Sequence, residues 1–136
     1  MERLIIQHCA PTLANLKTAN LVNWRGDINE EDFMRCKKKL KEKGVDITIL
    51  GKREKGALLY VYRRKRLESD LSQIKVFSIL RKFGYKSIDV DYCLDFLSKR
   101  IDKSPCFPHE IGLFLSYPPE DVLGFIENKG QNFKCL

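Results

Sequence analysis

A cysteine near the start of the chain is placed where it could act as a nucleophile. Cys9 follows His8, precedes a Pro-Thr turn and lies close in sequence to Lys17. A nearby cation lowers the pKa of a thiol and so increases the fraction of reactive thiolate. Adjacent residues on a helix point in different directions, however, so His8 need not assist Cys9. A thiol packed beside a turn that positions the next strand explains the same residues.

A second candidate site lies in the segment Phe107-Pro-His-Glu. His109 titrates near neutral pH, and Glu110 at the start of a helix could orient a partner. The segment lacks the second histidine, four residues later, that the helix of a zinc protease requires. A structural interpretation is also available, because Pro108 suits a first helical turn and Glu110 suits the positive end of the helix dipole.

The sequence contains no recognisable motif for binding a metal or a nucleotide cofactor. The five cysteines form no Cys-x-x-Cys pair, and the chain has only two histidines. A metal site would require Cys9, Cys106 and His109 to converge in space, which the sequence leaves open. Neither of the common glycine-rich phosphate loops is present. We therefore assign no metal, leave the cofactor open, and keep Cys9, Lys17, His109 and Glu110 as catalytic candidates.

Basic residues are concentrated in one segment of the chain. From residue 35 to residue 66 there are 13 Lys or Arg and three Asp or Glu, a net charge of +10, while the rest of the chain sums to −3. The segment contains two basic runs, Lys37, Lys38, Lys39 and Arg63, Arg64, Lys65, Arg66. Such runs are often simply solvated, but they also steer an acidic protein or an anionic ligand toward docking. Tyr60 and Tyr62 share one side of a predicted strand and could stack on bases, which adds nucleic acid as an alternative.

The first half of the chain has the pattern of a β-α-β-β unit. Asp27 or Asn29 can cap a helix that runs through Lys43 and ends at Gly44. A short helix over 2–9, ending before Pro11, precedes it, as does an extended segment over 16–24. Strands are predicted over 45–50 and 57–62, and the charged, glycine-bracketed link 51–56 joins them as a hairpin.

The second half has the pattern of several helices. Apolar residues recur every three positions and predict one helical face that stops at Gly84: Leu71, Ile74, Phe77, Leu80 and Phe83. Ser87 is the expected cap of the next helix. Pro108 and the Pro118-Pro119 pair should open two shorter helices.

The last two predicted helices imitate a helix-turn-helix motif of the kind that binds DNA. The second of them, however, begins with Glu120 and Asp121. Carboxylates at the leading end of a recognition helix would face phosphates and oppose binding. We therefore interpret the pair as a packed helical hairpin.

Length and composition predict one α+β domain. The chain has 136 residues, 43% of them hydrophobic, which suffices for an independent core. No apolar run approaches the roughly 20 residues of a membrane-spanning helix, and the N-terminus lacks the features of a signal peptide. The odd, scattered cysteines are typical of reduced thiols. We expect a single cytoplasmic domain over 1–136, made of a basic β-α-β-β half (1–66) and a helical half (67–136), with no membrane partner and an undecided oligomeric state.

Three stretches of the chain resemble a known family. They cover residues 9–21, 58–63 and 107–126 and read CAPTLANLKTANL, LLYVYR and FPHEIGLFLSYPPEDVLGFI. Together they resemble a bacterial family of anaerobes catalogued as domain of unknown function 3793, which implies a family name without an activity. The chain departs from the family pattern at Asn15 and Ser116, where glycine is usual, and it lacks the aromatic-rich C-terminal tail of its relatives.

These observations lead to three functional hypotheses. The first is a non-enzymatic binding or accessory protein that engages an acidic protein partner or an anionic ligand through its basic face. The second is a small thiol-dependent enzyme or redox or cofactor-binding protein centred on Cys9, assisted by Lys17 and His109. The third is a nucleic-acid-binding module. The first follows from charge segregation without an assembled catalytic motif.

Overall fold

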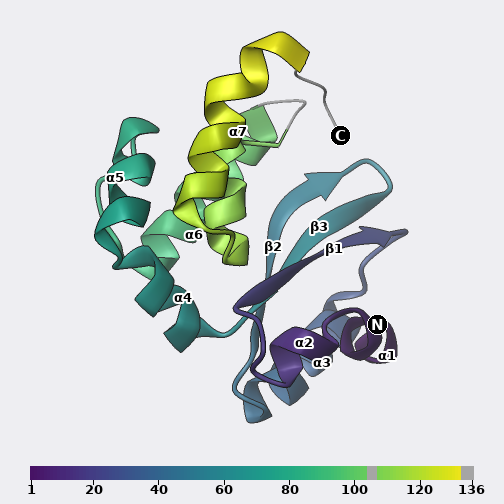
Figure 1. Cartoon of the computed structure of the whole chain (residues 1–136). Helices are drawn as coiled ribbons and strands as arrows, with labels where there is room; N and C mark the ends of the chain where they lie inside the picture. Colours follow the sequence, from purple (N-terminus) through teal and green to yellow (C-terminus); the bar gives the residue numbers. More distant parts are fainter. Residues whose placement is uncertain (104–106, 133–136) are drawn as a thin grey trace. The chain divides into compact units, whose positions relative to one another are not determined.

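The computed structural model describes residues 1–103 and 107–132 (Figure 1). The chain forms two compact units, Met1–Lys65 and Arg66–Leu136, whose boundary lies one residue from the one predicted between the two halves. A small antiparallel sheet and several helices confirm the α+β class. Within the described ranges, no helix combines the length and the apolar character needed to cross a bilayer. The single-domain organisation over 1–136 stays a prediction.

The first unit contains the β-α-β-β pattern predicted from the sequence. Its elements are α1 (Glu2–His8), α2 (Ala10–Leu13), β1 (Ala19–Arg25), α3 (Glu30–Glu42), β2 (Asp46–Arg53) and β3 (Gly56–Tyr62). The strands are antiparallel in the order β1-β3-β2, so the β2–β3 hairpin is extended by β1 on the far side of β3.

One face of this sheet and the helices of the first unit share a core. Ile5 and Cys9 from the N-terminal segment and Cys36 and Leu40 from α3 pack against the strands. The strand residues of this cluster are Val22, Ile47, Ala57, Leu59 and Val61. The three from β3 alternate along the strand, as one face of a pleated sheet requires. In Figure 1 the three helices of this unit gather on one side of the sheet. The core thus fixes which side of α3 faces outward.

Two details of the first unit differ from the predictions. Helix α1 ends at His8, before Pro11, as predicted, but a second short helix, α2, follows it and holds that proline in its first turn, where its missing N–H is not needed. The hairpin link is also shorter than predicted. Strand β2 continues to Arg53 through a bulge between Ile49 and Gly51, and bulges allow a strand to continue past a residue that does not fit the ladder.

The second unit is helical, as predicted, but its first helices are divided differently. Its elements are α4 (Arg64–Leu71), which begins two residues before the unit, then α5 (Ile74–Lys82), α6 (Val90–Lys103), the 3₁₀ helix η1 (His109–Leu115) and α7 (Pro119–Asn132). The prediction of one apolar face through 71–83 is wrong, because the chain leaves the helix between Leu71 and Ile74. Gln73 has extended backbone angles, and Ile74 is 88% exposed.

The caps and turns of the second unit follow local chemistry. Asp89, rather than Ser87, caps α6 by accepting a hydrogen bond from the N–H of Tyr92 at 3.0 Å, while Ser87 accepts one from the N–H of Asp89. The predicted hairpin of short helices consists of η1 and the longer α7. A Cβ atom at Gly112 of η1 would lie about 3.1 Å from the side chain of Val122 in α7, so the two helices pack closely there.

Candidate functional site

The outer side of α3 presents the first predicted basic run. Asn29 caps the helix by accepting two hydrogen bonds from N–H groups of its first turn, and Cys36 and Leu40 are buried on its inner side. Three exposed lysines on the outer side form what we call the lysine face: Lys37, Lys38 and Lys41. Lys39 is exposed on another side of the helix, since each residue adds about 100° of rotation. The cap and the buried side together hold the lysine face outward.

An exposed methionine lies beside the lysine face. Met34 lies one helical turn before Lys37 and Lys38 and is 59% exposed. No residue whose side chain the structure describes forms an ion pair with the three lysines. The face therefore combines positive charge that no ion pair among the described residues neutralises with a flexible apolar side chain, a combination that can bind the surface of another protein.

The second predicted basic run, residues 63–66, is divided between a hydrogen-bonded arginine and the first turn of a helix. Arg63 donates hydrogen bonds from Nε to the carbonyl oxygen of Thr12 at 2.7 Å and from Nη2 to that of Leu13 at 2.6 Å. Its guanidinium is therefore engaged in fixing α2 to the end of β3. The other three residues of the run, Arg64, Lys65 and Arg66, form the first turn of α4, so they do not continue a strand as a flat basic strip.

Tyr60 and Tyr62 do not form an exposed stacking platform. Their relative exposures are 0% and 6%, and their rings stack on each other with centroids 4.9 Å apart. Aromatic binding of single-stranded nucleic acid requires ring faces that bases can reach. The feature on which the nucleic-acid hypothesis depended is therefore missing at these two residues.

Cys9 is a packed thiol in the first unit. It is fully buried in the core beside Cys36. Burial, and to a lesser extent the Cys36 thiol, raises the pKa of Cys9 to about 11, and the opposing effect of Lys17 is smaller. His8 is exposed at the end of α1. A protonated, inaccessible thiol is the reverse of what nucleophilic catalysis needs.

Glu110 is the centre of a buried polar cluster in the second unit. Its carboxylate is fully buried and accepts hydrogen bonds from both Nε and Nη2 of Arg100, the second at 3.0 Å. Tyr85 donates its hydroxyl to the same carboxylate at 2.9 Å, and the Arg100 guanidinium lies over the Phe83 ring at 5.0 Å. Burial, followed by the charge of Glu110, raises the pKa of Tyr85 well above its usual range.

This cluster connects three parts of the second unit. Glu110 joins η1 to α6 through Arg100 and to the segment after α5 through Tyr85. His109 is half-buried next to Glu110 in the sequence, while Cys9 belongs to the other unit and Cys106 lies outside the described residues. In the described part of the chain, no three His, Cys, Asp or Glu residues group as metal ligands would.

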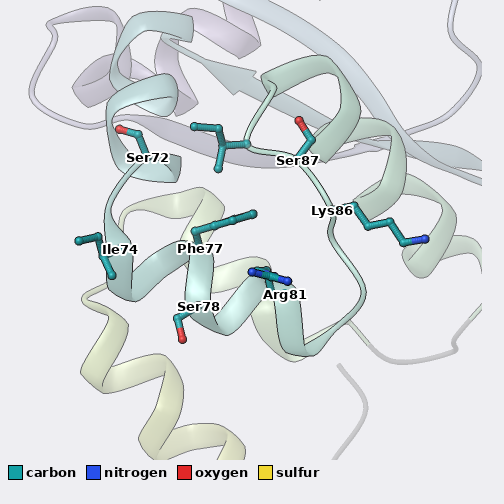
Figure 2. A pocket seen from close by; sticks show the side chains of 8 residues that line it. Ser72, Ile74, Phe77, Ser78, Arg81, Lys86 and Ser87 are labelled. Carbon is teal, nitrogen blue, oxygen red and sulfur yellow. The ribbon is translucent and has the colours of Figure 1, made fainter.

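A surface groove of about 760 Å³ lies in the second unit, between α5 and the segment that leads to α6 (Figure 2). Its lining combines apolar, cationic and hydroxyl side chains: Ile74, Phe77 and Ile88; Arg81 and Lys86; Ser72, Ser78 and Ser87. Figure 2 shows Phe77 and Arg81 projecting from α5, with Ser87 and Lys86 on the facing segment. The Arg81 guanidinium lies 5.8 Å from the centre of the Phe77 ring. The groove thus offers positive charge beside apolar surface.

The family model described as "Protein of unknown function (DUF3793)" matches residues 5–136. The chain belongs to this family. No curated protein and no solved structure matches the chain.

Two features of this family member now have a structural reason. Asn15 and Ser116, which stand where the resemblance implies glycine, both have positive φ angles, of 60° and 67°. Glycine adopts this conformation without the steric cost that other residues meet. Asn15 follows α2, and Ser116 ends η1. Both positions are therefore turns whose geometry favours glycine.

Sequence reasoning missed the groove in this family member because it assigned the wrong residues of α5 to the core. The buried residues of α5 are Val76, Ile79 and Leu80, which follow the i, i+3, i+4 spacing of a helical face more closely than a three-residue repeat. That pattern leaves Ile74 and Phe77 on the other side. Comparing the three-residue repeat with the i, i+3, i+4 spacing in the sequence could have identified the buried side of α5.

Proposed function

We propose that this protein is a binding protein that engages an acidic protein partner through the lysine face of α3. The supporting observation is that Lys37, Lys38 and Lys41 lie on one side of a capped, packed helix without ion-pair partners among the described side chains. Like charges held close together gain most when an acidic surface neutralises them. Such complementarity accelerates association and selects partners.

The chemistry around the lysines favours a protein over a nucleic acid. Met34 offers an apolar side chain that can bend to fit a partner. The tyrosines that were expected to stack on bases are buried. An interface with a methionine beside cations suits a partner surface that presents carboxylates next to an apolar depression.

The test uses the full chain and a defined acidic probe, poly-L-glutamate, followed by capture of cellular partners with a photo-crosslinker at position 34. The variant carries Lys37→Glu, Lys38→Glu and Lys41→Glu. Its control carries Lys55→Glu, Lys82→Glu and Lys103→Glu, which change the net charge equally at exposed positions elsewhere. We expect the first variant alone to lose binding by tenfold or more, and wild-type binding to weaken with salt, since charges are screened over about 8 Å at physiological ionic strength.

Several results would contradict the proposal. Equal losses in the two triple variants would mean that total charge, rather than the lysine face, controls binding. Tighter binding to single-stranded RNA than to poly-L-glutamate, lost in the first variant, would favour the nucleic-acid hypothesis. If the photo-crosslinker at position 34 captures no acidic protein, the proposal of a protein partner loses its support.

A further inference from the structure

We propose that the groove of the second unit binds a small organic anion that combines one carboxylate group with an apolar hydrocarbon body. This site lies on a different unit from the lysine face and takes a different kind of ligand. It therefore extends beyond the proposed protein-binding function and can be tested separately from it.

The apolar half of the proposed ligand matches side chains that the protein leaves exposed. Ile74 is 88% exposed and Ile88 is 44% exposed, and Phe77, which also lines the groove, is half-buried. Covering apolar surface is favourable in proportion to the area removed from water. A hydrocarbon body lying along these three side chains would cover them together.

The anionic half of the ligand matches the charge of the groove. Arg81 and Lys86 are its only charged lining residues among those described, and neither forms an ion pair with a described residue. The planar guanidinium of Arg81 lies over Phe77, which limits its orientations, and an arginine fork binds a carboxylate through two parallel hydrogen bonds. Ser87 uses its oxygen as an acceptor for the N–H of Asp89, which leaves its hydroxyl proton to donate.

The spacing of these groups sets the length of the ligand. Ile74 and Arg81 are at opposite ends of one face of α5, seven residues apart, which corresponds to about 10 Å along a helix. The groove volume of about 760 Å³ is in the range of small-molecule sites. A second hollow of about 450 Å³ shares Phe77, Arg81 and Lys86 with it, so the two hollows adjoin at these residues. A medium-chain carboxylate fits this arrangement.

The test measures binding of straight-chain carboxylates to the full chain. The probes are butyrate, hexanoate and octanoate, each below its micelle concentration. Binding is monitored through the amide chemical shifts of the protein in two-dimensional NMR. We expect shifts confined to residues of α5 and the segment 84–89, with affinity rising up to about fourfold per added methylene. Octanol and octylamine should bind at least tenfold more weakly, because they lack the charge that Arg81 pairs with.

Variants identify the side chains that carry the binding. Arg81→Gln should weaken octanoate binding by about tenfold, and Ile74→Ser should remove most of the dependence on chain length. Lys82→Gln is the matched control, because Lys82 is an exposed cation on the same helix outside the lining, and it should bind octanoate as the wild type does. Circular dichroism verifies that each variant is folded.

The outcomes against the proposal are equally specific. Shifts scattered over both units, equal binding of octylamine, or an unaltered affinity in Arg81→Gln would each overturn it. Phosphatidylglycerol vesicles that bind the protein through Arg81, when monomeric octanoate does not, would assign the groove to a membrane surface instead and would also overturn it.

Discussion

Arg100 binds both carboxylate oxygens of Glu110, which is fully buried although Arg100 is not. Glu110 brings a charge into the interior of the second unit, and Arg100 carries the compensating charge from a position with partial access to water. Buried ions of this kind are costly when unpaired and nearly neutral when paired. Removing one member of the pair should therefore lower the stability of the second unit more than the intact pair raises it.

We expect Arg100→Met to lower the free energy of unfolding by about 3 kcal/mol, because it leaves the Glu110 charge buried without its partner. Glu110→Gln should cost less, about 1–2 kcal/mol, since the amide oxygen still accepts the Tyr85 hydroxyl and the partly exposed Arg100 can turn to water. Urea denaturation of each single variant and of the double variant measures the coupling.

The exposed pair between Lys99 and Asp95 on the same helix is the control. Its atoms are 3.1 Å apart, but both side chains are 68% exposed. Lys99→Met should change the free energy of unfolding by less than about 1 kcal/mol. A loss at Arg100→Met no greater than that would show that the Glu110 charge is not effectively buried.

A second prediction concerns the link between Arg63 and α2. Arg63→Ala removes two charge-assisted hydrogen bonds to the carbonyl oxygens of Thr12 and Leu13 and should cost about 2–3 kcal/mol. Amide hydrogen exchange should accelerate selectively in residues 10–16. Arg53→Ala, at an exposed position on the same sheet, should leave exchange there unchanged. Uniform acceleration across the first unit would mean that Arg63 stabilises the whole unit rather than α2.

The sequence predicted those parts of the structure that local signals encode. The cap at Asn29, the stop at Gly44 and the hairpin depend on residues near each other in the chain, and these features were recovered. The partners of Arg63 lie 51 and 50 residues away in sequence, and those of Glu110 lie 25 and 10 residues away. Such contacts depend on packing that no single segment specifies, so both residues were first taken for site residues.

The candidate site was only partly predictable for the same reason. The lysine face follows from helical spacing once Phe33, Cys36 and Leu40 are recognised as the inner side. The groove required knowing where α4 ends and α5 begins. Sequence gives no strong breaker at Ser72 and Gln73, since neither glycine nor proline is present there.

The positive φ angles of Asn15 and Ser116 give a third prediction. At each position we expect the glycine variant to be more stable than the alanine variant by about 1 kcal/mol, because both remove the side chain and only alanine retains the strain of a Cβ atom. This comparison cancels the loss of the hydrogen bond from Ser116 to Asp70. Ala14, with φ of −83°, is the control at which glycine should be the less stable residue. Equal stabilities at position 15 would indicate that the turn relaxes.

A fourth prediction follows from the buried thiols of Cys9 and Cys93, whose pKa values burial raises to about 11. Between about pH 9 and 11 the unfolded chain releases these protons while the folded chain keeps them, so the folded protein should lose stability as the pH rises. Each thiol accounts for up to about 3 kcal/mol. Urea denaturation at several alkaline pH values should show a shallower decline in Cys93→Ala. An identical decline would assign the effect to other groups, such as Tyr85.

The reactivity of Cys9 provides the last prediction, and it separates a packed thiol from a nucleophile. At neutral pH, a rise in pKa to about 11 lowers the thiolate fraction roughly a hundredfold relative to an ordinary cysteine, and full burial lowers access further. Iodoacetamide labelling followed by peptide mass spectrometry should therefore modify Cys9 at least a hundredfold more slowly in the folded protein than in urea. Lys17→Gln should slow it little, because Lys17 is the weakest of the three influences on that thiol. Rapid, Lys17-dependent labelling of Cys9 in the folded protein would revive the thiol-dependent enzyme and would require a conformation in which α1 and α2 move away from the sheet.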